Sequence, residues 1–175
     1  MKVGIAGVGG IGSNVAVNLL RAGCTSLKLV DFDKVELSNL DRQFYFMHQI
    51  NRYKVDMLKD NLLQINGAAN IEVDRLFLDA GNMKASFQHC DILVEGFDEQ
   101  TSKKLFIETF SEQNFSIVSA SGIAGDRLDT IAVRQLGNCT IVGDFQSDFR
   151  NNALYPPKIS IIAAMMADIV LQKGI

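Results

Sequence analysis

Residues 4–20 read GIAGVGGIGSNVAVNLL, a stretch that sets a glycine-rich turn between an apolar strand and a helix. We expect the strand over Lys2–Ala6 and the helix over Ile11–Arg21, which Gly23 ends. Glycines in such a turn let backbone amides approach a phosphate, and the helix N-terminus adds a partial positive charge. The sequence therefore predicts a nucleotide-binding turn, although the turn alone does not choose between NAD, FAD and ATP. Its glycines are Gly7, Gly9, Gly10 and Gly12.

Strands and helices continue to alternate up to residue 120. This alternation is typical of a doubly wound, mostly parallel α/β sheet of the Rossmann-like kind. Further strands are expected at Leu27–Val30, Ile71–Leu76, Ile92–Glu95 and Ser116–Ala120. Further helices are expected at Arg52–Ile65, Asn82–His89 and Thr101–Phe110.

The pattern changes after residue 120. Thr130–Gln135 and Thr140–Val142 look like two strands joined by the turn sequence LGN, so we expect an antiparallel C-terminal extension of the sheet. An irregular connection then leads into a last helix, entered through Pro156 and Pro157, whose apolar stretch Ile159–Ala167 is expected to be buried. With 175 residues and no internal repeat, we expect residues 1–175 to form a single domain.

Composition excludes several classes of function. A net charge of -3 gives no support for broad nucleic-acid binding, which needs a basic face. The apolar stretch of the last helix is too short to cross a bilayer, and the start MKVGIAG lacks the features of a signal peptide. We therefore expect a cytoplasmic protein with no membrane partner. Cys24, Cys90 and Cys139 form no Cys-x-x-Cys pair, which argues against a four-thiolate zinc site and fits a reducing cytosol.

Two acids lie just beyond the second predicted strand. Asp31 and Asp33 point to the same side by strand alternation. A carboxylate here can accept hydrogen bonds from ribose hydroxyls, and Asp31 lies about where dinucleotide enzymes place such an acid. Asp33 has the plain alternative of a solvated loop residue. The pair fits a bound nucleotide without deciding which one.

The segment SNLDRQ, residues 38–43, separates phosphate transfer from hydride transfer. Asn39, Arg42 and Lys54 offer an amide and two cations, and Asp98 follows the fourth strand at the rim where parallel sheets bind ligands. Cations offset phosphate charge and an acid can hold Mg²⁺, whereas hydride transfer needs neither. Taken singly, Arg42 and Lys54 have an alternative as surface charges, and Asp98 as a helix N-cap. We expect neither cation to be a core residue.

Together, these features match a known pattern. The glycine turn, LVDFD at residues 29–33, SNLDRQ, Lys54 and the Asp98 turn resemble the ThiF/MoeB/HesA family, the bacterial relatives of ubiquitin-activating enzymes. The resemblance spans nearly the whole chain. The stretches IVGDF and LYPPKISIIAAMMADIVL are most similar to the short ThiF-like proteins linked to thiamine synthesis.

The resemblance implies adenylation, by ATP, of the C-terminal glycine of a ubiquitin-like sulfur-carrier protein with a Gly-Gly tail, giving acyl-adenylate and pyrophosphate. It further implies Mg²⁺, a sulfur donor and a homodimer. The family's ribose acid carries over to Asp31 and its Mg²⁺-linked acid to Asp98. Its phosphate-side residues carry over to Asn39, Arg42 and Lys54, with Gln43 in a supporting position.

The chain departs from the family at several positions. Gly143–Pro157 contains no cysteine that could bond to the carrier, and Glu99 and Lys103 stand where relatives often have asparagine and arginine. Relatives also often carry an arginine before the first strand, which we expect to be missing or replaced here. Cys139 is expected to be a buried strand residue. The adenylation step is therefore expected to need no enzyme thiol.

Two other functions stay open. A non-catalytic carrier-binding module is favoured by the missing arginine and disfavoured by the intact cations and acid. An NAD-dependent oxidoreductase would leave Arg42 and Lys54 unexplained. His48 and His89 have no spacing to other ligands and are expected to be solvated or capping residues. The segment SASGIAGDRLD, residues 119–129, is expected to form either a wall of a tail-binding cleft or a simple turn.

Overall fold

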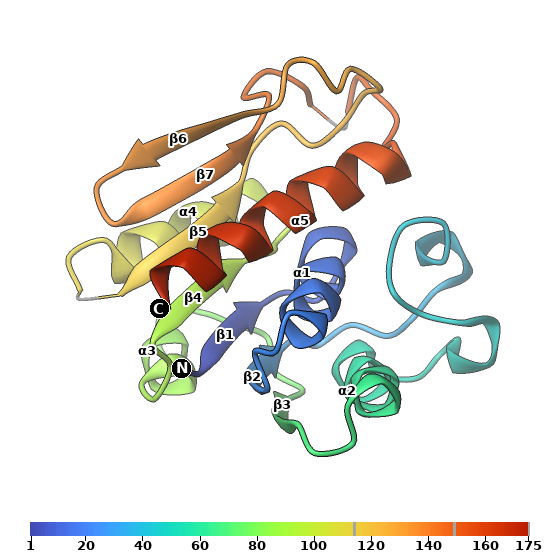
Figure 1. Cartoon of the computed structure of the whole chain (residues 1–175). Coiled ribbons are helices and arrows are strands. Elements are labelled where there is room, and N and C mark those ends of the chain that lie inside the picture. The colour runs from blue at the N-terminus through green and yellow to red at the C-terminus, as the bar shows by residue number, and fades with distance from the viewer. Residues whose placement is uncertain (114, 149, 175) are drawn as a thin grey trace.

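A parallel sheet forms the centre of the molecule. The computed structural model describes residues 1–113, 115–148 and 150–174. Within these ranges the sheet has seven strands in the order β3-β2-β1-β4-β5-β7-β6 (Figure 1). Neighbours among the first five strands are parallel, so the predicted doubly wound sheet is confirmed. These strands are β1 (Val3–Ala6), β2 (Ser26–Val30), β3 (Asn70–Asp74), β4 (Ile92–Glu95) and β5 (Ser116–Ala120).

The antiparallel extension is confirmed as well, with an order along the sheet that the sequence did not predict. The later strand, β7 (Cys139–Gly143), pairs in parallel with β5, and β6 (Ala132–Leu136) pairs antiparallel with β7 at the edge. Gly137 makes the hairpin turn with a φ of 57°. The amide nitrogen of the Asn138 side chain donates to the carbonyl oxygens of Phe110 and Phe115, each at 2.9 Å. These bonds tie the turn to the segment before β5.

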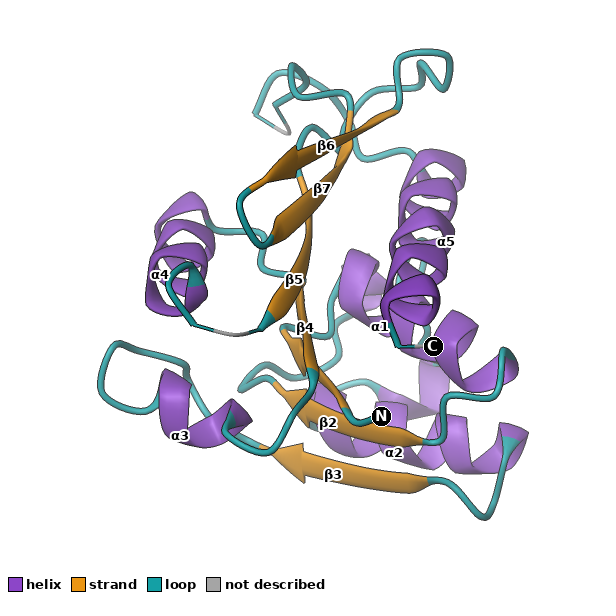
Figure 2. Ribbon diagram, turned by 60° about the vertical axis from the view of Figure 1, so that its left-hand side comes forward, coloured by secondary structure: helices purple, strands orange, loops and turns teal. Residues whose placement is uncertain are grey.

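Helices cover both faces of the sheet (Figure 2). On one face lie α1 (Gly10–Arg21), α2 (Lys54–Ile65) and α5 (Pro156–Lys173), with α5 packed against α1. On the other face lie α3 (Met83–Phe87) and α4 (Gln100–Phe110), where the aromatic rings of Phe87, Phe106 and Phe110 form a second core. Because apolar side chains fill both sides, the inner strands are buried throughout.

Several boundaries differ from those expected. Helix α2 begins at Lys54 and not at Arg52, because Asn51 takes a φ of 67° and Tyr53 forms an isolated bridge with Lys34. Strand β3 ends at Asp74, since its pairing with β2 ends at Val30. Helix α5 extends well beyond its apolar stretch, with Pro156 at its first position. None of the helices in the described ranges is long and apolar enough to cross a membrane.

Candidate functional site

A cavity of about 640 Å³ opens at the carboxyl ends of β1, β2 and β4. This volume lies within the range of small-ligand sites, roughly 300–1,000 Å³. Parallel sheets of this kind hold their ligands at this edge, outside the strand ends. The cavity brings together most of the residues that the sequence singled out: Gly7, Gly9, Gly10, Asp31, Asp33, Arg42, Gln43, Lys54 and Asp98.

The glycine turn is packed too tightly for side chains. Gly7 has a φ of 81°, and a Cβ built on Gly12 would lie 1.9 Å from the carbonyl oxygen of Gly7. A Cβ on Gly96, which follows β4, would lie 2.7 Å from the same oxygen. Gly12 therefore does not line the cavity but lets α1 approach β1. Gly10 and Ile11, the first residues of α1, line the cavity, and a helix N-terminus favours an anion there.

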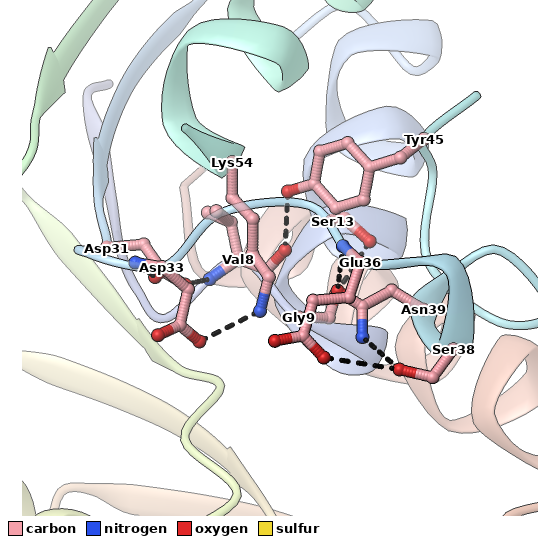
Figure 3. A network of polar contacts seen from close by, with 10 residues as sticks. All are labelled: Val8, Gly9, Ser13, Asp31, Asp33, Glu36, Ser38, Asn39, Tyr45 and Lys54. Atoms are coloured by element: carbon pink, nitrogen blue, oxygen red, sulfur yellow. Dashed lines mark hydrogen bonds and ion pairs between the residues drawn. The ribbon is translucent and has the colours of Figure 1, made fainter. Parts of the chain in front are cut away.

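Asp31 is buried beside the turn and fixes its shape. One carboxylate oxygen, Oδ2, accepts from the Val8 amide at 2.8 Å, and Oδ1 accepts from the Asp33 amide at 2.8 Å (Figure 3). The pKa of Asp31 is raised overall, because the effect of burial outweighs the lowering by these two amides and by the charge of Lys54. The carboxylate lies on the cavity wall with lone pairs to spare, so it can still accept from a ligand hydroxyl.

A buried tyrosine, Tyr45, holds the glycine turn through one hydrogen bond. The hydroxyl of Tyr45 donates to the carbonyl oxygen of Val8 at 2.7 Å. Burial, together with the negative charges of Asp31 and Asp33, raises the pKa of Tyr45 well above its ordinary value. The hydroxyl therefore stays protonated and keeps its role as a donor. Figure 3 shows the ring reaching in from the segment that follows Asn39.

Lys54 and Asp33 form an ion pair at the cavity wall. The ammonium nitrogen Nζ lies 2.9 Å from Oδ2 of Asp33, and the Lys54 amide donates to the Asp33 carbonyl oxygen, also at 2.9 Å. Lys54 is only 7% exposed, so the expectation that neither cation is a core residue is wrong for it. Its side chain is buried because it runs back from the start of α2 to meet Asp33. Asp33 is therefore more than a solvated loop acid.

The SNLDRQ segment, residues 38–43, lies against α1, and we call it the arch. Arg42 lines the cavity, and its Nη1 atom donates to the Ser38 carbonyl oxygen at 2.8 Å and to Oδ1 of Asp41 at 2.7 Å. The Asn14 side chain holds the Arg42 carbonyl oxygen at 2.9 Å. These three bonds restrain the arch. The guanidinium is thus held at the cavity with donors still available.

Asn39 and Gln43 behave differently from each other. Asn39 is buried and does not line the cavity; its Oδ1 atom accepts from the Glu36 amide at 3.1 Å, which caps the short helical turn Leu37–Asn39. In this structure Asn39 shapes the arch instead of facing a ligand. Gln43 does line the cavity, and within the described part of the chain its buried Oε1 atom has no hydrogen-bond partner.

Asp98 lies on an exposed turn between β4 and α4, at the rim of the cavity, with Glu99 beside it. In the ranges that the structure describes, no group of three or more side chains of His, Cys, Asp and Glu could hold a metal ion. Mg²⁺ bound with a nucleotide needs only one or two carboxylates, because phosphates and water complete its shell. Asp98 and Glu99 fit that donor set.

The far wall of the cavity is apolar, and its residues Leu154 and Ile159 were not expected from the sequence. It includes Ile123, Leu154 and Ile159, which come from the loop after β5, the connection before α5 and α5 itself. Ile123 belongs to the predicted wall segment and lies between Gly122 and Gly125, both with positive φ. Ala124 and Leu154 pair as an isolated antiparallel bridge, which joins the two loops.

Aromatic and aliphatic side chains line the side next to the acids of β2. Phe32 and Phe77 meet edge to face with ring centroids 5.0 Å apart, and both are about half exposed. Leu76, Leu78 and Phe97 complete this side. The run Leu76–Leu78 could have been suspected, since it follows a strand at the same edge. Together with the polar wall, this surface suits a flat apolar ring attached to a charged group.

The cysteines lie away from the cavity. All three are buried and free, and Cys139 lies in β7. Burial raises the pKa of Cys90 and of Cys139 to about 11, so both thiols stay protonated at neutral pH. His48 and His89 are also absent from the cavity wall. Neither a thiolate nor an imidazole among the described residues is placed to react with a ligand there.

Sequence relatives of the chain are enzymes that carry out adenylation or activation. The chain is 45% identical over 71 residues to ubiquitin-like modifier-activating enzyme 5 of Caenorhabditis elegans, covering 41% of this chain and 17% of that protein. It is 32% identical over 123 residues to adenylyltransferase and sulfurtransferase MOCS3 of Caenorhabditis briggsae, covering 70% and 31%. The chain therefore spans less than a third of the length of either relative. Molybdopterin-synthase adenylyltransferase of Haemophilus influenzae is 28% identical over 166 residues, covering 94% and 68%.

Solved structures share the fold. Escherichia coli tRNA N6-threonylcarbamoyladenosine dehydratase, TcdA, in complex with AMP superposes with a TM-score of 0.86 at 17% identity, covering 99% of this chain and 87% of that one. E. coli MccB with AMPCPP and MccA gives a TM-score of 0.78 at 23% identity, covering 98% and 55%. A family model described as the ThiF family matches residues 1–173.

Proposed function

Because the chain belongs to the ThiF family, we propose that it uses ATP to adenylate the C-terminal carboxylate of a ubiquitin-like protein. The observation that carries this proposal is the composition of one cavity, in which the glycine turn, Asp31, two cations and Asp98 meet. Relatives named as adenylyltransferases and as a modifier-activating enzyme support the reaction class. Similar folds solved with AMP and AMPCPP support an adenine nucleotide.

In the proposed complex the polar wall holds the nucleotide. The amides at the start of α1 receive phosphate oxygens, and Asp31 accepts from ribose hydroxyls. Phe32 and Phe77 provide apolar surface for the base. Mg²⁺, when bound, would be held by Asp98 with Glu99 beside it, and it supplies positive charge to the phosphates.

The proposed reaction needs positioning and charge more than proton transfer. An oxygen of the partner's terminal carboxylate attacks the α-phosphorus, forming an acyl–phosphate bond. The bond from the α-phosphorus to the bridging oxygen breaks, and pyrophosphate leaves with that electron pair. Arg42 and Lys54 offset the negative charge that builds up on the phosphates, which is the role such donors have in phosphoryl chemistry. No enzyme nucleophile takes part, consistent with the buried, protonated cysteines.

We further propose a sulfur-carrier protein with a Gly-Gly tail, ThiS-like, as the partner. A tail of two glycines is narrow and can pass in extended form between the apolar far wall and the phosphate side. The ThiS-like choice rests on the resemblance of the IVGDF and LYPP segments to short ThiF-like proteins. A sulfur donor and a second copy of this chain complete the proposed set of partners, and light scattering would measure the latter.

The direct test is carrier-dependent exchange of labelled pyrophosphate into ATP. We expect exchange with a carrier that ends in Gly-Gly, and none with the same carrier amidated at its C-terminus, because the amide removes the attacking oxygen. ATP with Mg²⁺ should also raise the melting temperature; a ligand at 100 times its Kd adds about 2.7 kcal/mol. Stabilisation by NAD and none by ATP would contradict the proposal. Carrier binding without exchange would point to the non-catalytic module.

A further inference from the structure

An ion pair between the buried Glu95 and the partly exposed Lys103 lies next to the turn that carries Asp98. Glu95, the last residue of β4, is fully buried, and its carboxylate oxygen Oε2 accepts from the ammonium of Lys103 and from the hydroxyl of Ser119. Lys103 lies on α4, eight residues further along the chain, and Ser119 lies on β5. The cluster of Glu95, Lys103 and Ser119 therefore joins β4, α4 and β5 at the edge of the sheet where the cavity opens.

The same carboxylate also holds the turn itself. Its second oxygen, Oε1, accepts from the backbone amide of Phe97 at 2.7 Å. Lys103 in turn donates to the carbonyl oxygen of Ala120 at 2.9 Å, at the end of β5. Two of these contacts, to the Phe97 amide and to the Ala120 carbonyl oxygen, thus hold backbone segments at the carboxyl ends of β4 and β5. None of Glu95, Lys103 and Ser119 lines the cavity.

The turn is held on two further sides. Gly96 fits against the glycine turn without room for a Cβ, and the ring of Phe97 packs edge to face on Phe106 with centroids 5.9 Å apart. Asp98 follows immediately and is exposed at the cavity rim. Its backbone position is therefore set by the residues before it, while its own carboxylate remains free to meet a ligand.

The chemistry of the cluster favours positioning over simple stabilisation. Burying the Glu95 carboxylate costs free energy, and apolar side chains of similar volume often stabilise a protein as well as a buried charged group does. Apolar side chains, however, could not accept from the partly buried Phe97 amide, which would lose this partner. A buried charge that binds a turn next to a ligand site is typical of residues that orient metal ligands.

We propose that Glu95 and Lys103 are positioning residues that set the Asp98 turn for binding of the metal–nucleotide complex. The part that concerns Mg²⁺ and ATP rests on the proposed function. The part that concerns the turn stands on the hydrogen bonds alone. Two readouts therefore separate the two ideas: amide hydrogen exchange of Phe97, which needs no activity, and the Mg²⁺ concentration that half-saturates ATP–pyrophosphate exchange.

The main variant is Lys103→Met, which keeps the length of the side chain and removes its charge. Its matched control is Lys104→Met, because Lys104 is the next residue on α4, is exposed and, among the described residues, forms an ion pair only with the exposed Glu108 at 3.7 Å. We expect Lys103→Met to speed hydrogen exchange at Phe97 and to raise the Mg²⁺ requirement about 10–100-fold, the usual cost of losing such a support. Lys103→Arg should restore both, and Lys104→Met should change neither.

A second variant covers the case in which Lys103→Met does not fold. Ser119→Ala removes one donor to Glu95 and leaves the ion pair in place, so both readouts should move in the same direction by a smaller factor. If the wild-type chain shows no ATP–pyrophosphate exchange, the proposed function fails, and Phe97 hydrogen exchange still tests the turn. Folded Lys103→Met or Ser119→Ala with unchanged Phe97 exchange and unchanged Mg²⁺ requirement would overturn the proposal.

Discussion

The ammonium of Lys158 lies 2.6 Å from the carboxylate oxygen Oδ2 of Asp144, although Lys158 is only 1% exposed. The same nitrogen donates to the carbonyl oxygen of Ala124 at 2.6 Å. Three segments meet here: the first turn of α5, the turn after β7 and the loop after β5. Ala124 follows Ile123 and pairs with Leu154, so this buried lysine fixes the apolar far wall of the cavity.

We expect Lys158→Met to destabilise the protein by about 3–5 kcal/mol, because it leaves the buried Asp144 carboxylate without its partner. Urea unfolding followed by circular dichroism measures this loss. Lys173→Met, at the exposed end of the same helix, is the matched control and should lie within about 0.5 kcal/mol of the wild type. Equal stability of the two variants would show that the ion pair contributes nothing.

Acid should weaken the same contact over a defined range. Burial alone would raise the pKa of Asp144, but the ion pair with Lys158 and the amides of Ser147 and Gln146 lower it to about 2, from 3.8. A lowered pKa means that the stabilisation is present above about pH 4 and is lost as the pH falls towards 2. The melting temperature should fall across this range, and the fall should be smaller in Lys158→Met.

Substitution of either cation of the cavity should slow the reaction, but the two substitutions should differ in their effect on stability. We expect Arg42→Ala and Lys54→Ala each to slow carrier-dependent ATP–pyrophosphate exchange by about 10²–10³, since each removes a donor to developing phosphate charge. Arg42→Ala removes a partly buried side chain with two hydrogen bonds and should cost about 1 kcal/mol, whereas Lys54→Ala removes a buried side chain and should cost about 1–3 kcal/mol. Near-normal exchange in both folded variants would contradict the assigned roles.

Gly12 offers a test of the turn that requires no knowledge of the partner. Gly12→Ala would place a methyl group 1.9 Å from the Gly7 carbonyl oxygen, so α1 must move away from β1. We expect loss of stabilisation by ATP together with a lower melting temperature. Gly67→Ala is the control, because its Cβ would meet the Leu63 carbonyl oxygen at an ordinary 3.7 Å. A Gly12→Ala variant that binds ATP normally would rule out this packing.

The cysteines should be dispensable for adenylation. Cys90 and Cys139 have pKa values raised by burial to about 11, so a thiol reagent at pH 8 should modify the native protein slowly. The triple substitution of Cys24, Cys90 and Cys139 by alanine should retain carrier-dependent exchange per folded molecule. Mass spectrometry and the exchange assay check the two statements. Loss of exchange in a folded triple variant would reveal a covalent step.

Much of the fold could be predicted because periodic patterns determine it. Apolar strands alternating with amphipathic helices gave the parallel sheet, and the turn at Gly137 marked the antiparallel hairpin. The pattern could not tell that β7 would insert between β5 and β6, because both strands of a hairpin fit the edge of a sheet equally well from sequence alone. Pairing with β5 is decided by tertiary packing, which local patterns do not record.

In the candidate site as well, residues marked by local patterns were predicted and residues placed by loop geometry were not. Asp31, Arg42, Lys54 and Asp98 follow strands or a specific motif, so sequence reasoning found them, and the structure places them around one cavity. The role of Asn39 in capping its own turn depends on loop geometry that no periodicity describes. The contact of Ile123 and Leu154 with the cavity also depends on the geometry of irregular loops, which periodic patterns do not describe. Glu95 carried a signal, since an acid that ends a buried strand needs a partner, and Lys103 follows on the next helix.

The two walls of the cavity come from different stretches of the chain. The polar lining comes mainly from residues 7–54 and the Asp98 turn, whereas Ile123, Leu154 and Ile159 belong to the last third of the chain. A gene that accumulates changes in that last third can reshape the apolar wall while leaving the nucleotide side untouched. With such a division, related proteins can keep the residues of the polar wall and still differ in the apolar wall, and so in the molecule that this wall contacts.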